Sequence, residues 1–291
     1  MAEAKLSVMT NFLHYGTGVF EGIRGNWNEE RKQTYIFRLK EHYERLIKGC
    51  KVLKITLPHT VDQFCQLTVE LVAKNGLKED LYIRPLAYKC TEALGVRCHG
   101  LEDGFFMFVI PWGPYLNVEK VKCGVSSWRR PGNNVMPAQT KITGQYINSA
   151  LAKTEAYENG FDEAILLTEE GYVSEGSGEN IFLVIDGSLV TPPIYNSILP
   201  GITRDTVIKL AKDELGIEII ERQIDRTELY MANEAFFTGT ATHIAPIGEI
   251  DHRPVGNGEI GSITAKLQKI YTDVIRGISP KYISWCTPVY K

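Results

Sequence analysis

Several features that would place a protein in a special class are missing from this chain of 291 residues. No apolar run approaches the roughly 18–20 residues that a membrane-spanning helix needs. The 32 basic and 35 acidic residues are interspersed and leave a net charge of -3, so no basic face for nucleic acid is expected. The first residues lack the basic and then apolar order of a signal peptide. We therefore expect a cytoplasmic protein that binds neither a membrane nor nucleic acid.

The six cysteines are scattered, and no two of them form a Cys-x-x-Cys pair. A disulfide framework and a zinc site both need clustered or regularly spaced cysteines, so the sequence predicts neither of them. Buried, reduced thiols are the simplest interpretation. No metal site is predicted.

Apolar runs and helical stripes alternate along the chain, which is typical of an α/β fold. Strands are predicted over residues 33–38, 81–86, 104–110, 121–128, 164–167, 180–185 and 235–239. Helices are predicted over residues 40–53, 60–75, 144–159, 203–216 and 259–275. The helix over 144–159 is expected to bury an apolar face made of Tyr146, Ile147, Ala150, Leu151, Thr154 and Tyr157.

The stretch Pro111-Trp112-Gly113-Pro114 interrupts the regular pattern and predicts a domain boundary. We expect a small N-terminal α/β domain over residues 1–111 and a linker over 112–121. Residues 122–291 would form the larger C-terminal domain. Two α/β domains are the simplest architecture for this pattern.

Lys141 is the first candidate for chemistry, because it lies just before a helix among small and polar residues. A lysine that forms a Schiff base needs a lowered pKa, which partial burial beside positive or dipolar groups supplies. Most lysines are solvated, so an ordinary loop lysine is the alternative.

Three further segments have side chains or amides that suit an anion or a ring nitrogen. Glu175 stands on a glycine-rich turn, where a carboxylate would keep a pyridine nitrogen protonated or would simply be exposed. A helix is expected to begin at the segment Pro200-Gly201-Ile202-Thr203, where its first backbone amides and its dipole would bind a phosphate. The alternative is that Thr203 only caps the helix N-terminus. Residues 238–242 end a strand and would hold a carboxylate or phosphate, or form an ordinary tight turn.

Together these segments resemble a fold-type IV pyridoxal phosphate enzyme, and above all a branched-chain amino acid aminotransferase. The motifs follow in the family's order and comprise residues 14–24 (HYGTGVFEGIR), 82–86 (YIRPL), 111–116 (PWGPYL) and the segments of Lys141, Glu175, Thr203 and Thr240. The resemblance implies a two-domain α/β (α+β) fold with the cofactor pyridoxal 5'-phosphate between the domains, held mainly by the C-terminal domain. It implies transamination between leucine, isoleucine or valine and 2-oxoglutarate, a step of branched-chain amino acid biosynthesis.

The same resemblance implies roles for residues that would hold the cofactor. Lys141 would bind it covalently and move the reacting proton, and Glu175 would pair with the pyridine nitrogen. Tyr146 would hydrogen-bond the ring oxygen. The phosphate would be held by Arg45, Ile202, Thr203 and Thr240, although pattern alone predicts that Arg45 is a solvated surface arginine.

The substrate would meet a second set of residues, again by resemblance. Tyr82, oriented by Arg84, would bind the α-carboxylate together with the amides of Thr240 and Ala241. Arg84 would also meet the distal carboxylate of glutamate. The apolar pocket would be lined by Phe20, Trp112, Tyr115 and Tyr146. Tyr15 and Val96 would come from a neighbouring subunit, which implies a homodimer or a larger homo-oligomer.

Arg97 and His99 leave an alternative open, because they are similar to the carboxylate-binding pair of D-amino acid aminotransferases with the same fold. Small pocket changes redirect transaminase specificity, so a D-amino acid or (R)-amine transaminase remains the second hypothesis. A noncatalytic small-molecule-binding protein on this fold is the third.

Overall fold

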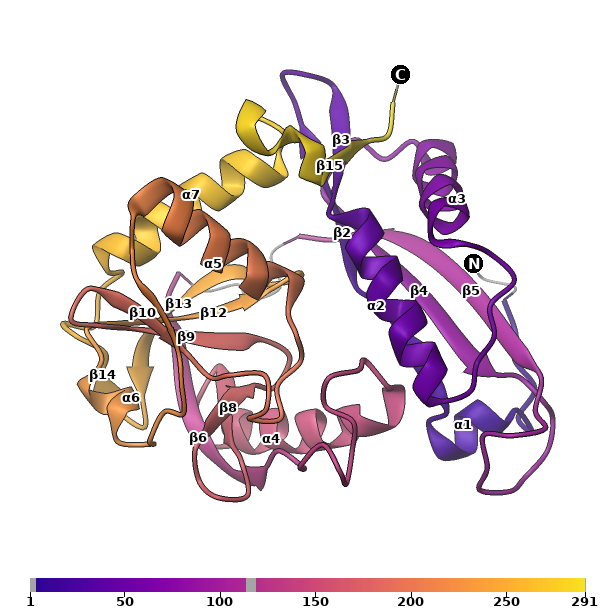
Figure 1. Ribbon diagram of the computed structural model, residues 1–291, viewed down its shortest axis with the longest axis horizontal. Helices are drawn as coiled ribbons and strands as arrows, with labels where there is room; N and C mark the ends of the chain where they lie inside the picture. The colour runs from indigo at the N-terminus through magenta and orange to yellow at the C-terminus, as the bar shows by residue number, and fades with distance from the viewer. Residues whose placement is uncertain (1–3, 114–118, 291) are drawn as a thin grey trace. The chain divides into compact units, whose positions relative to one another are not determined.

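The computed structural model describes residues 4–113 and 119–290, which form two compact units (Figure 1). The first unit contains Met1–Gly113, Thr140–Tyr146 and Asp273–Lys291, and the second contains Pro114–Gln139 and Ile147–Thr272. The predicted boundaries placed everything after residue 121 in one domain. The structure instead assigns the Lys141 segment and the C-terminal segment to the first unit.

The first unit is built on an antiparallel sheet of six strands in the order β1-β4-β2-β3-β15, with β5 beside β4. Its strands are β1 (Gly18–Phe20), β2 (Ile23–Asn28), β3 (Gln33–Phe37), β4 (Leu81–Lys89), β5 (Asp103–Pro111) and β15 (Cys286–Pro288). Its helices are α1 (Asn11–Tyr15), α2 (Leu39–Val52) and α3 (Val61–Asn75), with 3-10 turns η1 (Thr143–Gln145) and η2 (Pro280–Trp285). β15 pairs with β3, which explains why the C-terminal segment belongs to this unit.

The apolar faces of α2 and α3 supply much of the core of the first unit. Tyr43 of α2 stacks on Phe64 of α3, with ring centroids 5.2 Å apart. The bounds of α3 follow from its end residues: Thr60 and Gln63 form a reciprocal capping box, and Gly76 ends the helix in a left-handed conformation. The predictions of helices at 40–53 and 60–75 are therefore confirmed.

The second unit is built on a mixed sheet of nine strands in the order β11-β10-β9-β12-β13-β6-β7-β8, with β14 beside β13. Its strands are β6 (Val121–Arg129), β7 (Glu163–Leu167), β8 (Val173–Gly176), β9 (Asn180–Ile185), β10 (Ser188–Thr191), β11 (Ile219–Glu221), β12 (Glu234–Gly239), β13 (His243–Ile250) and β14 (Arg253–Pro254). Its helices are α4 (Tyr146–Glu158), α5 (Ile202–Leu215), α6 (Glu228–Met231) and α7 (Ser262–Ile275). In Figure 1, α5 and α7 lie on the same side of strand β12.

Strand β9 lies at the centre of the core of the second unit. Ile181 and Leu183 join the large apolar cluster on one face of the sheet. Phe182 points the other way and stacks on Phe236 of β12, with ring centroids 5.2 Å apart. Burial on both faces accounts for the nearly continuous apolar sequence of this strand, and the predicted strand over 180–185 is confirmed.

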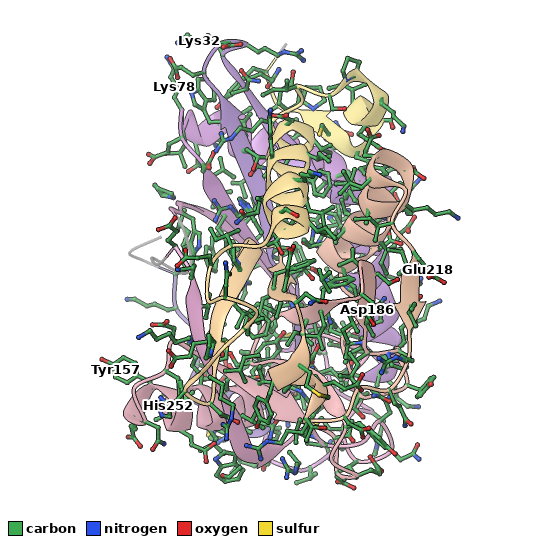
Figure 2. All side chains as sticks on the ribbon, turned by 90° about the vertical axis from the view of Figure 1, so that its left-hand side faces the viewer. Lys32, Lys78, Tyr157, Asp186, Glu218 and His252 are labelled. Atoms are coloured by element: carbon green, nitrogen blue, oxygen red, sulfur yellow. The ribbon has the colours of Figure 1, made fainter. Side chains whose placement is uncertain are left out.

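Helix α4 is present where the sequence predicts it, but the predicted buried face was wrong. Its buried residues are Ser149, Ala152 and Ala156, and the two alanines pack with Ala164 and Leu166 of β7. Small side chains let the helix approach the strand closely, so the larger apolar side chains are left outside. Tyr157 is 77% exposed and lies at the surface in Figure 2.

Two further results concern the described part of the chain. All six cysteines are free; Cys50, Cys123 and Cys286 are buried, and the other three are partly exposed. Among the helices in the described ranges, none has the length and apolar character needed to cross a membrane.

The first residues of α7 depend on a carboxylate from β12, and this dependence can be tested. Glu234 accepts hydrogen bonds from the backbone N–H groups of Ile263 (3.1 Å) and Thr264 (2.8 Å), and from the Thr264 hydroxyl (2.7 Å). Because these amides lack intrahelical partners, we expect Glu234→Ala to lower the free energy of unfolding by about 2 kcal/mol. Urea denaturation measures the change. Glu169→Ala, at an exposed turn, is the control, and an equal effect of both substitutions would contradict the capping role.

Candidate functional site

The segment that contains Lys141 is held against strand β1. The Phe20 N–H donates to the Lys141 carbonyl at 3.1 Å, Ile142 forms an isolated bridge with Val19, and the Thr143 hydroxyl donates to the Gly16 carbonyl at 2.7 Å. Gly16 has a φ of 62°, and a Cβ there would lie 2.6 Å from the Cα of Gly144, so no side chain fits. The position of Lys141 is therefore set by residues that are distant in sequence.

Two aromatic rings that pack on each other lie beside the Lys141 amine. Its Nζ atom lies 5.5 Å from the ring centroid of Phe20 and 5.7 Å from that of Tyr146, and these two rings are 4.8 Å apart. Burial lowers the pKa of Lys141, but the neighbouring Tyr146 hydroxyl and the Glu21 carboxylate outweigh burial and Arg45, so the pKa is raised. The predicted lowering is wrong for this structure, because the prediction did not include these two groups.

Glu21 was not predicted as a site residue, although it lies in a quoted motif. Its carboxylate is fully buried and accepts from Arg45 Nε at 2.6 Å, from Arg45 Nη2 at 2.8 Å and from His42 Nδ1 at 2.7 Å. Burial alone would raise the pKa of Glu21, but Arg45 and His42 hold it far below its usual range. The pattern-based prediction of a solvated Arg45 was wrong, since its side chain is only 13% exposed.

Tyr82 and Arg84 are brought together in the first unit, as expected. Arg84 Nη2 donates to the Tyr82 hydroxyl at 3.0 Å, and the guanidinium carbon lies 4.5 Å from the ring centroid of Phe20. Trp112 packs beside Tyr82 with ring centroids 5.2 Å apart. We call Phe20, Tyr82, Arg84, Trp112, Lys141 and Tyr146 the aromatic cluster.

Arg24 is a buried neighbour of the aromatic cluster that the sequence analysis missed. It lies opposite Tyr82 in the register of β2 and β4, and its Nη1 atom donates to the Gly113 carbonyl at 3.1 Å. The predicted pocket residue Tyr115 lies outside the described residues, so the structure gives no position for it.

In the second unit, Glu175 lies in strand β8 rather than on an exposed turn. Its Oε2 atom accepts from Asn180 Nδ2 at 3.1 Å and from the Leu199 N–H at 3.0 Å. Its Oε1 atom lies 3.4 Å from Arg130 Nε. Two hydrogen bonds and an ion pair therefore orient one buried carboxylate, and the alternative of a simple exposed acid is wrong. No sequence pattern identified Arg130 or Asn180 as a candidate site residue.

Helix α5 begins at Ile202, and its N-cap is Gly201, which forms no side-chain capping bond. Thr203 is buried in the first turn, so the alternative of plain N-capping by Thr203 is wrong. A Cβ on Gly201 would lie 2.0 Å from Asn180 Oδ1. The same asparagine therefore supports both Glu175 and the start of α5, whose dipole favours an anion.

Thr240 and Ala241 occupy the turn between β12 and β13 and are partly exposed. The next residue, Thr242, donates from its hydroxyl to Glu179 Oε1 at 3.1 Å. In strand β7, Glu163 is also fully buried and pairs with Lys153 at 2.6 Å. In the ranges 4–113 and 119–290, no group of three or more histidine, cysteine or acidic residues could hold a metal ion.

The residues expected to serve a neighbouring subunit lie on one side of the first unit. The Tyr15 hydroxyl accepts from the Gly95 N–H at 3.0 Å, and Asn11 Nδ2 donates to the carbonyls of Ala93 and Gly95, each at 3.2 Å. Val96 follows and is 89% exposed. Arg97 and His99 are exposed in the same loop, and the contacts of the described residues bring neither to Tyr82 or Arg84.

Comparison with known proteins places this geometry among the aminotransferases. Residues 18–250 match the family described as amino-transferase class IV. The chain is 48% identical over 289 residues to the probable branched-chain-amino-acid aminotransferase of Aquifex aeolicus, covering 99% of this chain and 93% of that protein. It is also similar to the branched-chain aminotransferase of Thermoproteus uzoniensis solved with norvaline, with a TM-score of 0.95, 48% identity, and coverage of 99% of this chain and 95% of that one. The branched-chain amino acid aminotransferase of Thermobaculum terrenum, solved in its PLP form, gives a TM-score of 0.95 and 40% identity, covering 100% and 95% of the two chains.

The Tyr146 hydroxyl raises the pKa of Lys141, so we expect Tyr146→Phe to lower that pKa. Purified protein is treated with hydroxylamine and dialysed, which frees the amine from any bound carbonyl compound. Competitive acetylation followed by peptide mass spectrometry then gives the pH at which half of Lys141 reacts. Tyr157→Phe, at a position that is 77% exposed, is the matched control and should leave this pH unchanged. An unaltered midpoint in Tyr146→Phe would show that Tyr146 does not set the charge of Lys141.

Proposed function

Because the chain belongs to the class IV aminotransferase family, we propose that it transfers the amino group of leucine, isoleucine or valine to 2-oxoglutarate. The products are the branched-chain 2-oxo acids and L-glutamate. The observation that carries this proposal is the position of the Lys141 amine, which lies beside both Phe20 and Tyr146 in the aromatic cluster. Relatives named as branched-chain aminotransferases match nearly the whole chain, which supports the substrate class. A location in the cytoplasm stays a prediction.

We propose pyridoxal 5'-phosphate as the cofactor, because the donor groups of both units fit its parts. When bound, it supplies an aldehyde for an amine and a ring that accepts electrons. The first unit offers the Lys141 amine, the Tyr146 hydroxyl and the Arg45 guanidinium, which Glu21 orients. The second unit offers the oriented Glu175 carboxylate for the ring nitrogen, and the start of α5 for phosphate.

Each of these groups then has a defined task. Lys141 would hold the cofactor covalently and would carry the proton to and from the substrate Cα. Glu175 would keep the ring nitrogen protonated, and two hydrogen bonds and the ion pair with Arg130 hold its carboxylate in one orientation. The phosphate is held by Arg45, by Ile202 and Thr203 at the start of α5, and by Thr240.

We propose that the aromatic cluster explains how two unlike side chains are accepted. Phe20, Trp112 and Tyr146 offer apolar surface to a leucine-like side chain. Arg84 offers a charge to the distal carboxylate of glutamate, while its place over the Phe20 ring compensates that charge when an aliphatic side chain is bound. Tyr82 and the amides of Thr240 and Ala241 bind the α-carboxylate.

The substrate assignment is tested by mixing the holoenzyme separately with L-leucine and D-alanine and following the visible absorbance of the cofactor. We expect L-leucine to bleach the band rapidly and D-alanine to leave it, because relatives named for branched-chain substrates match the whole chain. The reverse response would establish the D-amino acid alternative, with Arg97 and His99 as the candidate carboxylate-binding pair. A purified protein without a visible band would favour the noncatalytic hypothesis.

Borohydride reduction and peptide mapping identify the lysine in the same preparation. The label is expected on Lys141, and Lys141→Ala should lose turnover while the far-ultraviolet circular dichroism is kept. A label on another lysine would refute the proposed mechanism. Lys153→Ala is less suitable as a control, since it would leave the buried Glu163 without its ion pair. Lys122→Ala, whose side chain is exposed, is the better one.

We also propose a homodimer in which the loop with Val96 contributes to the partner's site. Leu13, Leu94 and Val96 are all more than half exposed, and Asn11 and Tyr15 hold the backbone beside them in place. Such ordered apolar side chains are typical of an interface. Light scattering should give twice the mass of one chain, and Val96→Asp should weaken association, whereas Val135→Asp, also exposed, should not. A fully active monomer would contradict the proposal.

A further inference from the structure

Glu179 is a buried carboxyl group to which the proposed mechanism gives no task. It lies between the turn that follows Glu175 and the turn that contains Thr240 and Ala241. Its Oε2 atom accepts from the Gly178 N–H at 3.0 Å, on the turn that follows Glu175. Its Oε1 atom accepts from the Thr242 hydroxyl at 3.1 Å, on the turn that contains Thr240 and Ala241. One side chain therefore joins the two turns.

The packing leaves Glu179 little room to do anything else. Its side chain is 4% exposed. A Cβ on Gly176 would lie 2.9 Å from Glu179 Oε2, and a Cβ on Gly239 would lie 3.5 Å from its Cγ atom. Both positions are glycine, so the strand ends at Gly176 and Gly239 approach the carboxyl group closely.

We propose that Glu179 is a positioning residue for substrate carboxylate binding: through Thr242 it holds the turn whose Thr240 and Ala241 amides receive the α-carboxylate, and it does so in its uncharged form. This inference rests on the proposed function. A neutral carboxyl group keeps both contacts: Oε2 accepts from the Gly178 N–H, while a protonated Oε1 donates to the Thr242 hydroxyl. It places no negative charge behind an anion site. An ionised one keeps the bonds but repels the bound carboxylate.

The surroundings of Glu179 favour the uncharged form. Burial and the nearby Glu163 carboxylate on β7 raise the pKa of Glu179 to about 8, against the Gly178 N–H, Lys153 of α4 and Thr242, which lower it. Cys123 on β6 is another titratable neighbour, and the pKa of its thiol is raised by burial, Glu163 and Glu179. Glu179 is therefore protonated and neutral below about pH 8, and it becomes negatively charged above that pH.

Glu179→Gln is the informative variant, because its amide imitates the protonated carboxyl group in size and hydrogen bonding. The probe is 4-methylvalerate, which has the carbon skeleton of leucine without the amino group and so binds without reacting. Its dissociation constant is measured by calorimetry with the holoenzyme between pH 6.5 and 9.5. From pH 7 to pH 9 we expect the wild type to weaken about tenfold more than Glu179→Gln, the effect of one charge close to the ligand.

Two further variants distinguish the effect of the turn's position on ligand binding from the effect of the charge on Glu179. Thr242→Val removes the hydroxyl that transmits the position, so it should weaken binding about fivefold or more at pH 7, on the scale of one lost hydrogen bond. Its affinity should still fall as Glu179 ionises, but at a higher pH than in the wild type, because the Thr242 hydroxyl lowers the pKa of Glu179. Glu169→Gln is a matched substitution at an exposed turn and should resemble the wild type at every pH.

The outcomes are distinguishable from failure of the proposed function. Parallel pH curves for the wild type and Glu179→Gln, or an unchanged affinity in Thr242→Val, would overturn the role of Glu179 alone. A wild-type protein that forms no holoenzyme, or a holoenzyme that binds no 4-methylvalerate, would overturn both proposals. If Glu179→Gln does not fold, the Thr242→Val result decides whether the contact positions the turn.

Discussion

The pairing of residues 140–146 with strand β1 is the constraint on which the first unit's site depends. Lys141 has no secondary structure of its own to orient it; its backbone is held by the Phe20 amide, the bridge between Ile142 and Val19, and the hydrogen bond from Thr143 to Gly16. These contacts also bring Tyr146 beside Phe20, because it follows the same segment. A single docked segment therefore sets the distance from the amine to both rings. The close approach of Gly16 and Gly144 permits that docking, and a Cβ at Gly16 would prevent it.

Buried carboxylates differ in charge across the protein because their partners differ. Glu21 is as buried as any residue in the chain, yet Arg45 and His42 keep its pKa far below the usual range, so it is a permanent anion that orients a cation. Glu179 has no cation in direct contact among the described pairs, and Glu163 lies nearby, so its pKa moves in the opposite direction. Burial penalises both charges in the same way. The choice of neighbour decides which of the two keeps its charge.

Much of the architecture was predictable because long amphipathic helices and apolar strands carry a periodic signal. Helices α2, α3, α5 and α7 and strand β9 all lie where the periodicity places them. Short strands such as β1 and β8 were missed, since three or four residues hold no period and depend on distant partners. The buried face of α4 was wrong because small residues pack it against β7. The order of the motifs selected Lys141 and Glu175 as candidate site residues. It did not select Glu21, Arg130 or Asn180, because their contacts join segments that are distant in the sequence.

Substrate range follows from how strongly a positive charge near an apolar surface is compensated. Arg84 donates to the Tyr82 hydroxyl and lies over the faces of both Phe20 and Tyr82, at 4.5 and 5.2 Å from the ring centroids. The guanidinium thus has a hydrogen-bond acceptor and two π faces before any ligand arrives, which lowers the cost of leaving it without an anion. An unsupported arginine would favour only dicarboxylates, and an aromatic wall without it would favour only aliphatic side chains. An enzyme whose substrates alternate between apolar and acidic side chains requires both the arginine and the aromatic wall. The geometry of Arg84 therefore supports the L-branched-chain assignment. The exposed Arg97 and His99 give less direct support to the D-amino acid alternative.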